Sequence, residues 1–428
     1  MDTIFALASG RGRAGVAVIR LSGPMSHAIV GALCGDVPAV RHASLRKLRW
    51  QGDILDEALV LTFAAGASFT GEQSAELHVH GGIAVVEAVF TALRSFLETR
   101  LAEAGEFTRR ALENGRLALF EVEGLVDLID AETEAQRKQA QRMLRGDLAT
   151  KVVEWRRDLL GATALIEATI DFADEDVPVD VWPEVQRLLQ AVTAGLAGEL
   201  SGARAAERIR AGFEVAIFGP PNVGKSSLIN ALVGRDVAIT SDIAGTTRDV
   251  IESRLDLNGL PVVLIDTAGL RESTDVIERE GVRRARARVE EADIRVLVRD
   301  ADHAAWEPGV TVDFTISSKA DLGEAAPGSM RVSVRTGEGI AALREALAAR
   351  LAEIASVAGV VVNERHRLGV ANAETAIRAA MGGIDAGLEA EVIAAGLREG
   401  RRFLEALVGQ IGVEDVLGEI FGRFCIGK

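Results

Sequence analysis

The chain has 428 residues, of which 48% are hydrophobic, and this composition is typical of a globular protein with several buried cores. Lys and Arg number 48 against 63 Asp and Glu, so the formal net charge is −15, which disfavours a protein that binds nucleic acid over its whole surface. Aromatic residues make up 4% of the chain and Tyr is absent, so stacking platforms for nucleic-acid bases are not expected.

The start of the chain and the spacing of its cysteines indicate the cellular compartment. The start is acidic and soon interrupted by Arg11 and Arg13, which is unlike a signal peptide. No apolar run has the length needed to span a bilayer. Cys34 and Cys425 lie far apart and do not suggest a disulfide framework, which indicates a reducing compartment. We therefore expect a cytoplasmic protein with no membrane association.

Residues 1–115 mix β-rich runs with helical stretches. The β-rich runs are 16–21, 58–63 and 75–79, and two helix-like stretches accompany them. This mixture predicts an α+β domain.

From about residue 116 to residue 210 the pattern becomes helical. Apolar residues such as Val122, Ile129 and Leu144 recur near helical spacing, with Glu, Gln and Arg between them. An acidic segment that ends in Pro178 interrupts this pattern, and a further helix is expected over 183–210. Residues 116–210 thus predict a helical domain.

The stretch from Gly219 to Ser226 fits the phosphate-binding pattern G-x-x-x-x-G-K-[ST]. The apolar run 213–218 before it predicts a strand, and the residues after it predict a helix that ends at Gly234. In a strand–loop–helix unit, backbone N–H groups and the helix N-terminus point at a β-phosphate. Lys225 would meet the β and γ oxygens, and Ser226 a Mg²⁺ ion.

Two further motifs complete the expected metal site. Asp266-Thr267-Ala268-Gly269 follows the predicted strand 261–265, and an aspartate is expected there at the carboxyl end of a sheet strand. The segment Gly245-Thr246-Thr247-Arg248-Asp249 lies between this motif and the phosphate loop, and its threonine could complete the Mg²⁺ shell.

Two motifs near residue 320 indicate which base is bound. Ser318-Lys319-Ala320-Asp321 follows a predicted strand at 310–316, and Ser333-Val334-Arg335 follows another at 330–332. The carboxylate of Asp321 can accept from the N1 and N2 donors of guanine, whereas adenine offers no such pair. Five motifs in this order, each just beyond a strand, predict a GTPase.

The GTPase module occupies about residues 211–359, and the helical pattern resumes from 363 to 420. Helical segments on both sides of one module predict that the module is inserted into a helical domain, because a P-loop domain places its termini close together. The second part of the helical domain would then be residues 360–428.

With these motifs placed, the whole chain resembles the MnmE family of tRNA-modifying GTPases, which is also called TrmE. Besides the nucleotide motifs, the resemblance rests on Phe69-Thr70-Gly71-Glu72, Gly105-Glu106-Phe107-Thr108 and the ending Phe424-Cys425-Ile426-Gly427-Lys428. It implies a folate-binding-like N-terminal α+β domain, a discontinuous helical domain and an inserted Ras-like P-loop GTPase domain. It also implies a homodimer joined through the N-terminal domains.

The resemblance implies an activity and a folate site. The family works with the flavoprotein MnmG, which carries FAD, to add an aminomethyl or carboxymethylaminomethyl group at C5 of wobble uridine-34 in certain tRNAs. The one-carbon unit would come from 5-formyl- or methylene-tetrahydrofolate. By motif, the folate would contact Arg20, Glu76, Arg116 and Lys428. Cys425 is either a nucleophile in one-carbon chemistry or a small buried apolar residue, and the sequence favours neither.

The catalytic water needs a residue outside the Ras pattern. The position after Gly269 holds Leu270, and an apolar side chain cannot orient water as the Gln of Ras does. Glu272, Asp275, Glu278 and Glu280 all have suitable chemistry, although a solvated surface charge is the commoner reading for each of them. The resemblance selects Glu278, acting through a bridging water.

The resemblance also implies a K⁺ ion in place of an arginine finger. The ion would be held by Asn222 and by the carbonyls of Ser241, Ile243 and Thr246, with Mg²⁺ on Ser226 and Thr247. The residues expected around GTP are Asn222, Val223, Gly224, Lys225, Ser226, Ser227, Ser241, Asp242, Ile243, Ala244, Gly245, Thr246, Thr247, Asp266, Thr267, Ala268, Gly269, Ser318, Lys319, Ala320, Asp321, Ser333, Val334 and Arg335.

Ser318 departs from the usual Asn or Thr before Lys-x-Asp. A serine is shorter and lacks the paired donor and acceptor of an amide, so we expect fewer contacts that brace the base pocket. Weak nucleotide binding would follow.

Two alternatives remain open from the sequence. His78 and His80 share a face of a predicted strand and could suggest zinc, although packing or pocket lining is the commoner reading of such a pair. A GTPase switch for translation or ribosome assembly, without modification chemistry, is the alternative function.

Overall fold

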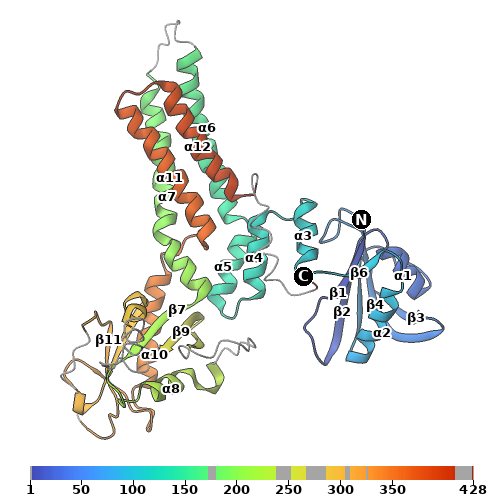
Figure 1. Cartoon of the computed structure of the whole chain (residues 1–428), viewed down its shortest axis with the longest axis horizontal. Helices are drawn as coiled ribbons and strands as arrows, with labels where there is room; N and C mark the ends of the chain where they lie inside the picture. Colours follow the sequence, from blue (N-terminus) through green and yellow to red (C-terminus); the bar gives the residue numbers. More distant parts are fainter. Residues whose placement is uncertain are drawn as a thin grey trace, which may run out of the picture. The chain divides into compact units, whose positions relative to one another are not determined.

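The computed structural model describes residues 2–171, 180–237, 252–266, 286–303, 309–323, 326–409 and 427. The chain divides into two compact units (Figure 1). Unit 1 comprises Met1–Val126 with Val408–Lys428, and unit 2 comprises Asp127–Leu407. No helix within the described ranges is long and apolar enough to cross a membrane.

Unit 1 contains a six-stranded sheet of order β3-β4-β5-β2-β1-β6, in which only the β1–β6 pair is parallel. Its strands are β1 (Thr3–Leu7), β2 (Ala14–Ser22), β3 (Ser44–Trp50), β4 (Asp53–Phe63), β5 (Ser74–Gly81) and β6 (Thr99–Leu101). The helices beside this sheet are α1 (Ser26–Cys34), α2 (Ile83–Arg94) and α3 (Glu106–Glu113). The three predicted β-rich runs fall within β2, β4 and β5, and the predicted α+β class is confirmed.

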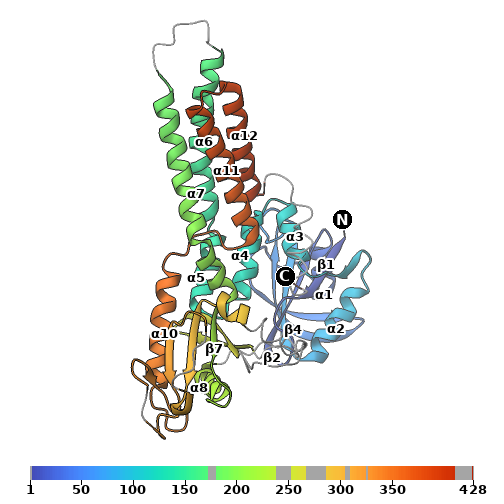
Figure 2. The ribbon, with the colours of Figure 1, turned by 60° about the vertical axis from the view of Figure 1, so that its left-hand side comes forward.

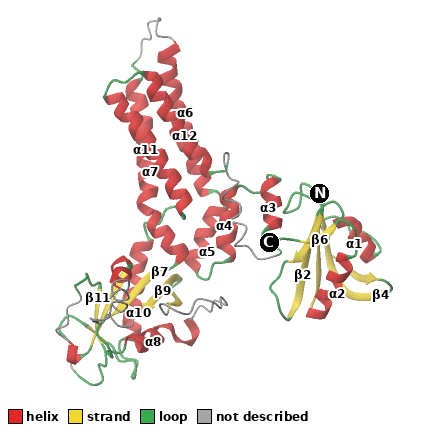
Figure 3. Ribbon diagram, viewed as in Figure 1, coloured by secondary structure: helices red, strands yellow, loops and turns green. Residues whose placement is uncertain are grey.

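Successive side chains of β1 point to opposite faces of this sheet, and helices cover both faces. Phe5 is fully buried in a core with residues of α1 and α2. Its neighbours Ile4 and Ala6 belong to a second cluster with Phe107 of α3. Helices α1 and α2 therefore cover one face, and α3 packs on the other (Figure 3).

A buried arginine ties α3 to the loop before β5. Arg110 is 9% exposed, and its guanidinium contacts Glu106 at 2.9 Å, Glu72 at 3.1 Å and Asp2 at 2.9 Å. Glu72 also accepts from the Ser22 hydroxyl at 2.6 Å. A buried charge with several charge-assisted hydrogen bonds is well compensated. The network thus fixes the loop that carries Phe69 and Thr70 beside the end of β2.

The helical part comprises α4 (Leu119–Ile129), α5 (Glu134–Leu144), α6 (Asp147–Asp171), α7 (Trp182–Ala211), α11 (Glu364–Asp385) and α12 (Ala390–Leu407). Helices α6, α7, α11 and α12 each pack against two of the others and form an elongated bundle (Figure 2). The predicted helix 183–210 is confirmed. The helical stretch predicted over 363–420 is confirmed as α11 and α12, and its part from 410 to 420 lies outside the described residues. The Asn363 side chain caps α11 by accepting from His366 N–H at 2.8 Å.

Close packing in the bundle requires glycine where α6 meets α7. A Cβ added at Gly195 would lie 2.6 Å from Nε1 of Trp155, so this side of α7 has no space for a side chain.

The nucleotide module is a second six-stranded sheet, of order β12-β11-β10-β7-β9-β8, and only β8 is antiparallel to its neighbour. Its elements are β7 (Phe213–Phe218), α8 (Lys225–Val237), β8 (Glu252–Leu257), β9 (Leu260–Asp266), β10 (Ile294–Arg299), a 3-10 turn (Ala301–His303), β11 (Phe314–Ser317), β12 (Met330–Arg331) and α10 (Ile340–Ala355). The predicted Ras-like α/β module and the strand at 213–218 are confirmed.

The structure corrects some predicted elements of this module. The strand predicted over 310–316 begins only at Phe314, because Val310 and Val312 pack as loop residues against a small core cluster. Asp313 bonds the backbone and side chain of Arg295 just before the strand starts. Gly234 has φ 50° and ψ 169°, which ends the first helical piece of α8 as predicted, but a second piece continues to Val237.

The two ends of the module lie together on α7. Helix α7 leads directly into β7, and a Cβ at Gly202 of α7 would lie 2.4 Å from the carbonyl oxygen of Val357, which follows α10. Glu199 of α7 accepts from the Val360 N–H at 2.8 Å. These contacts favour the inserted architecture, while the boundaries at residues 115, 210 and 359 remain predictions.

Candidate functional site

The phosphate-binding loop needs left-handed backbone at several positions. Gly219 follows β7 with φ 151°, and a Cβ there would lie 2.1 Å from the carbonyl oxygen of Val298. Asn222 at φ 62° and Gly224 at φ 96° turn the chain, while Val223 between them is fully buried and anchors the loop. Helix α8 then begins at Lys225, so its N-terminus faces the loop as predicted.

Lys225 is held within this loop. Its side chain is 8% exposed, and Nζ donates to the carbonyl oxygens of Gly219 at 3.1 Å and Pro220 at 2.8 Å. A buried ammonium group costs free energy unless acceptors surround it. The loop thus stabilises a positive charge where β- and γ-phosphate oxygens would lie.

Ser226 and Asp266 meet as expected for a Mg²⁺ site. The Ser226 hydroxyl donates to Oδ2 of Asp266 at 2.7 Å, and Asp266 is 7% exposed at the end of β9. Its other oxygen, Oδ1, is buried and has no hydrogen-bond partner among the described residues. An orphaned carboxylate oxygen beside a hydroxyl fits a hard divalent cation with its water shell.

Ser318 connects the base-binding motif to the phosphate loop. Its hydroxyl lies 2.7 Å from the carbonyl oxygen of Val223 and 2.9 Å from that of Arg299. A hydroxyl has a single proton, so it donates fully to one of these acceptors at a time. The serine therefore reaches the phosphate loop despite its length, but with fewer donors than an amide would bring.

Both carboxylate oxygens of Asp321 contact neighbouring side chains. Oδ1 accepts from the Ser333 hydroxyl at 2.5 Å, and Oδ2 pairs with the Arg335 guanidinium at 2.8 Å. The hydrogen bond from Ser333 holds the pKa of the Asp321 carboxyl below its ordinary value, so it is ionised at neutral pH. Because the Arg335 side chain is 73% exposed, it can turn aside and leave Oδ2 to the N–H groups of guanine.

Lys319 is fixed by a buried carboxylate. Its Nζ lies 2.9 Å from Oδ2 of Asp300, and His303 lies 2.7 Å from Oδ1 of the same group. Burial acts to raise the pKa of Asp300, but the bonds from Lys319 and His303 outweigh it, and the pKa is lowered. Lys319 also has φ 54°, a strained conformation typical of functional loops.

Several predicted site residues lie outside the described residues. They are Ser241, Asp242, Ile243, Ala244, Gly245, Thr246, Thr247, Thr267, Ala268, Gly269, Leu270, Glu278, Cys425 and Lys428.

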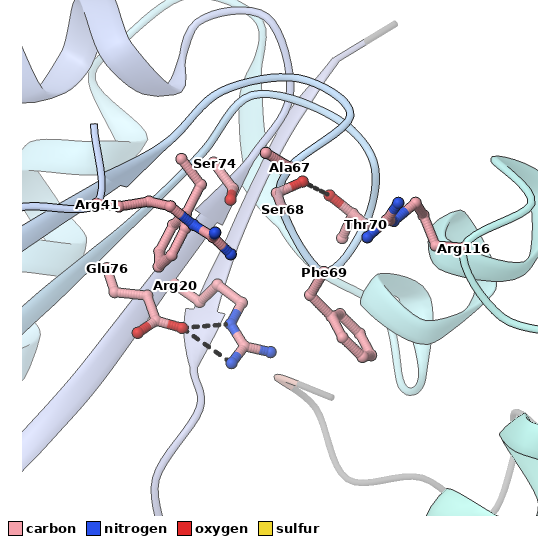
Figure 4. A pocket seen from close by; sticks show the side chains of 10 residues that line it. Arg20, Arg41, Ala67, Ser68, Phe69, Thr70, Ser74, Glu76 and Arg116 are labelled. Carbon is pink, nitrogen blue, oxygen red and sulfur yellow. Dashed lines mark hydrogen bonds and ion pairs between the residues drawn. The ribbon is translucent and has the colours of Figure 1, made fainter. Parts of the chain in front are cut away.

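A separate pocket in unit 1 brings together Arg20, Glu76 and Arg116 (Figure 4). Its volume is about 280 Å³, and Phe63 and Phe69 form part of its wall. Residues from β2, β5 and the segment after α3 thus converge here, as the motif assignment implied.

An ion pair organises this pocket. Arg20 donates through Nε and Nη2 to Oε1 of Glu76 at 3.1 and 3.0 Å, and His78 contacts Oε2 at 3.3 Å. The Arg20 guanidinium also lies 5.5 Å from the ring centroid of Phe69. The carboxylate of Glu76 is therefore fixed in place and can accept N–H groups from a ligand.

The histidine pair does not meet at a common ligand position. His78 bonds Glu76, whereas His80 lies 2.8 Å from Asp56 on β4. Within the part of the chain that the structure describes, no group of three His, Cys, Asp or Glu side chains could hold a metal ion.

One charged residue that lines the pocket was not expected from the sequence. Arg41 lines it from the connection between α1 and β3, where no motif marks the position. A lone arginine in a loop gives no signal in a single sequence, so contact with the pocket could emerge only from the fold.

Family models match nearly the whole chain. Residues 3–116 match the model described as GTP-binding protein TrmE N-terminus. Residues 119–425 match the model described as MnmE helical domain, and this match encloses the nucleotide module.

Full-length relatives share about half of the residues. The chain is 55% identical to the tRNA modification GTPase MnmE of Cereibacter sphaeroides, and 100% of each chain is covered. It is 54% identical to the MnmE of Roseobacter denitrificans and 48% to that of Paracoccus denitrificans, again over 100% of each chain.

Among solved structures, Era from Aquifex aeolicus bound to GDP.AlF4- is 28% identical over 32% of this chain and 56% of that chain, with a TM-score of 0.26. The G domain of the FeoB iron transporter of T. maritima is 25% identical over 33% of this chain and 98% of that chain, with a TM-score of 0.24.

Replacing Ser318 by Asn should strengthen guanine nucleotide binding. The amide would offer two N–H donors for the carbonyls of Val223 and Arg299, and one added hydrogen bond contributes about 0.5–1.5 kcal/mol. We expect micromolar or weaker GDP binding by the wild type in calorimetry, and tighter binding by Ser318→Asn.

The matched control is Ser329→Ala, which removes a hydroxyl that bonds Ser317 and the carbonyl oxygen of Ala326. It should leave the affinity unchanged. If Ser318→Asn binds GDP no better than the wild type, this account of the base pocket is wrong.

Proposed function

The chain belongs to the MnmE family of tRNA modification GTPases, and we propose from this membership that it acts with an MnmG partner on wobble uridine-34 of certain tRNAs. It would hydrolyse GTP while an aminomethyl or carboxymethylaminomethyl group is added at C5. The observation that carries the GTPase part is the meeting of Lys225, Ser226 and Asp266 at one sheet edge. A tRNA modification GTPase needs such a site for its nucleotide.

The residues of the nucleotide site have separate roles in this proposal. Lys225 neutralises the β and γ oxygens, and Asp321 selects guanine through its two acceptors. Ser226 and Asp266 would hold Mg²⁺, with Thr247 as a further ligand, and the ion would supply charge neutralisation between the phosphates. The bond from Ser318 to Val223 keeps the base and phosphate subsites in register.

We assign the orientation of the attacking water to Glu278, which would act through a second, bridging water molecule. The apolar side chain of Leu270 cannot orient water. We assign to a K⁺ ion the stabilisation of the negative charge that develops between the β- and γ-phosphates. This ion would be held by Asn222 and by the carbonyls of Ser241, Ile243 and Thr246. Support for the ion comes from Asn222, whose exposed side chain projects from left-handed backbone in the phosphate loop.

The pocket of unit 1 supports the folate part of the proposal. Glu76 would accept from ring N–H groups, while Arg20 and Arg116 would face anionic or carbonyl groups of 5-formyl- or methylene-tetrahydrofolate. Near the carboxyl end, a Cβ at Gly427 would lie 2.0 Å from the carbonyl oxygen of Leu7, so this residue lies against β1. Lys428 is assigned to the folate and Cys425 to the possible one-carbon chemistry by motif alone.

We also propose two protein partners, a second copy of this chain and MnmG. Support for a homodimer through the N-terminal domain comes from Leu45 and Leu59, which are opposite each other on β3 and β4 and are 61% and 37% exposed. FAD would be carried by MnmG in a heterotetramer, and the reaction would take place in the cytoplasm, where tRNA is modified.

The modification itself can be tested by mass spectrometry of nucleosides from tRNA. In cells that lack this protein, the C5-modified wobble uridines should disappear while bulk tRNA methylation stays normal. Wild-type protein supplied on a plasmid should restore them. Normal amounts of modified uridine in the deleted cells would instead favour a GTPase switch in ribosome assembly.

Replacing Glu278 by Ala should lower GTP turnover by a factor of about 10²–10⁴, the usual contribution of a positioned general base, with little loss of nucleotide affinity. Glu280→Ala is the matched control, because it removes the same charge two residues away. Turnover assays in which Glu278→Ala retains the wild-type rate would exclude this residue from the mechanism.

Hydrolysis should depend on potassium. A carbonyl cage of suitable size holds K⁺ better than Na⁺, so we expect the rate in K⁺ buffer to exceed that in Na⁺ buffer at equal ionic strength by at least about tenfold, or ~1.4 kcal/mol of barrier. Asn222→Ala should abolish the difference, whereas Asn230→Ala, which changes an exposed residue of α8, should preserve it. Equal rates in the two salts would refute the role of K⁺.

A further inference from the structure

The pocket of unit 1 contains a guanidinium group that the proposed function does not use. Three arginines and one glutamate line this pocket, which gives a formal charge of 3 − 1 = +2 in a chain whose net charge is −15. Arg20 is paired with Glu76, but Arg41 and Arg116 have no acidic partner among the described residues. The pocket therefore offers two guanidinium groups to an anionic ligand.

Arg41 is held in place by its loop. Its φ is 62°, a left-handed conformation that is uncommon for a side chain of this size, and its N–H donates to the carbonyl oxygen of Thr62 at 2.9 Å. Thr62 is fully buried and donates in turn to the carbonyl oxygen of Pro38 at 3.1 Å. Asp36 and Arg46 close the loop with two bonds of 2.8 and 2.9 Å.

Strain of this kind persists where the surrounding structure imposes it, and it marks candidate functional positions. For an ordinary solvated arginine, a fixed and strained backbone would bring no advantage. Here the fixed backbone directs the side chain into the pocket, and Figure 4 shows Arg41 and Arg116 entering from opposite sides.

The remaining walls indicate what the ligand resembles. Oε2 of Glu76 can accept an N–H group from a heterocyclic ring beside its contact with His78, and Phe63 and Phe69 supply apolar contact. A volume of about 280 Å³ is at the lower limit for small-molecule sites, so a ring fits while an extended tail must reach the rim. A ring with N–H donors and a tail with carboxylates matches this distribution of charge.

We propose that Arg41 binds a carboxylate of the glutamate tail of the folate and makes the pocket selective for folates over pterins that lack this tail. This inference rests on the proposed folate site. In this proposal Arg41 contributes to the binding of the glutamate tail, whereas Glu76 contributes to the binding of the heterocyclic ring. A planar guanidinium suits a carboxylate through two parallel hydrogen bonds, which a lysine cannot provide.

The test is calorimetry of the full-length protein with two probes, 5-formyltetrahydrofolate and 6-methyltetrahydropterin, which has the ring without the tail. The main variant is Arg41→Gly, because glycine accepts a φ of 62° without strain and the loop should stay folded. Arg41→Lys keeps the charge without the planar fork. Arg49→Ala, an exposed arginine on β3 outside the pocket, is the control for loss of one positive charge.

Arg41→Gly should bind the folate roughly ten- to a hundredfold more weakly, the usual effect of losing a charge-assisted hydrogen bond, and should bind the pterin as the wild type does. The affinity of Arg41→Lys for the folate should lie between those of Arg41→Gly and the wild type, and Arg49→Ala should bind the folate as the wild type does. If Arg41→Gly weakens both probes equally, or neither, the tail-binding role is wrong. Wild-type protein that binds neither probe would instead contradict the folate site itself.

Discussion

The parallel pairing of β7 with β9 and β10 is the constraint on which the nucleotide site depends. Ile217 is in register with Asp266, and Phe218 with Leu297, so these strands end at one edge of the sheet. The loop after β7 and the carboxylate at the end of β9 then meet without further adjustment. The hydroxyl of Ser318, just beyond β11, bonds the Val223 carbonyl and adds the base-binding motif to the same edge.

The same sheet is attached to the helical domain through its opposite end. Helix α7 continues into β7, and the Gln136 side chain of α5 donates to the carbonyl oxygen of Arg210 at 3.0 Å. The tight turn between β8 and β9 contributes a second attachment, because Ala135 N–H donates to the carbonyl oxygen of Gly259 at 2.9 Å. Two bonds from α5 therefore reach the end of α7, which leads into β7, and the turn that leads into β9.

Local chemistry explains which features could be predicted from the sequence. The strand 213–218 and the break in α8 at Gly234 follow from residue types that act over a few positions, and the structure confirms both, although a second helical piece continues to Val237. The start of β11 could not be predicted, since Val310 and Val312 are apolar for packing against a core cluster and not for strand pairing. Arg41 was missed for a related reason, because its role depends on Thr62, which is 21 positions away in the sequence.

The central claim is that Asp321 makes this edge of the sheet a guanine nucleotide site. The most direct measurement compares the hydrolysis of GTP and xanthosine triphosphate by the wild type and by Asp321→Asn. Xanthine carries an oxygen where guanine carries the 2-amino group, so an amide donor suits xanthine and a carboxylate suits guanine. The account predicts that the wild type prefers GTP and that Asp321→Asn prefers xanthosine triphosphate. A variant that keeps the wild-type preference for GTP would contradict it.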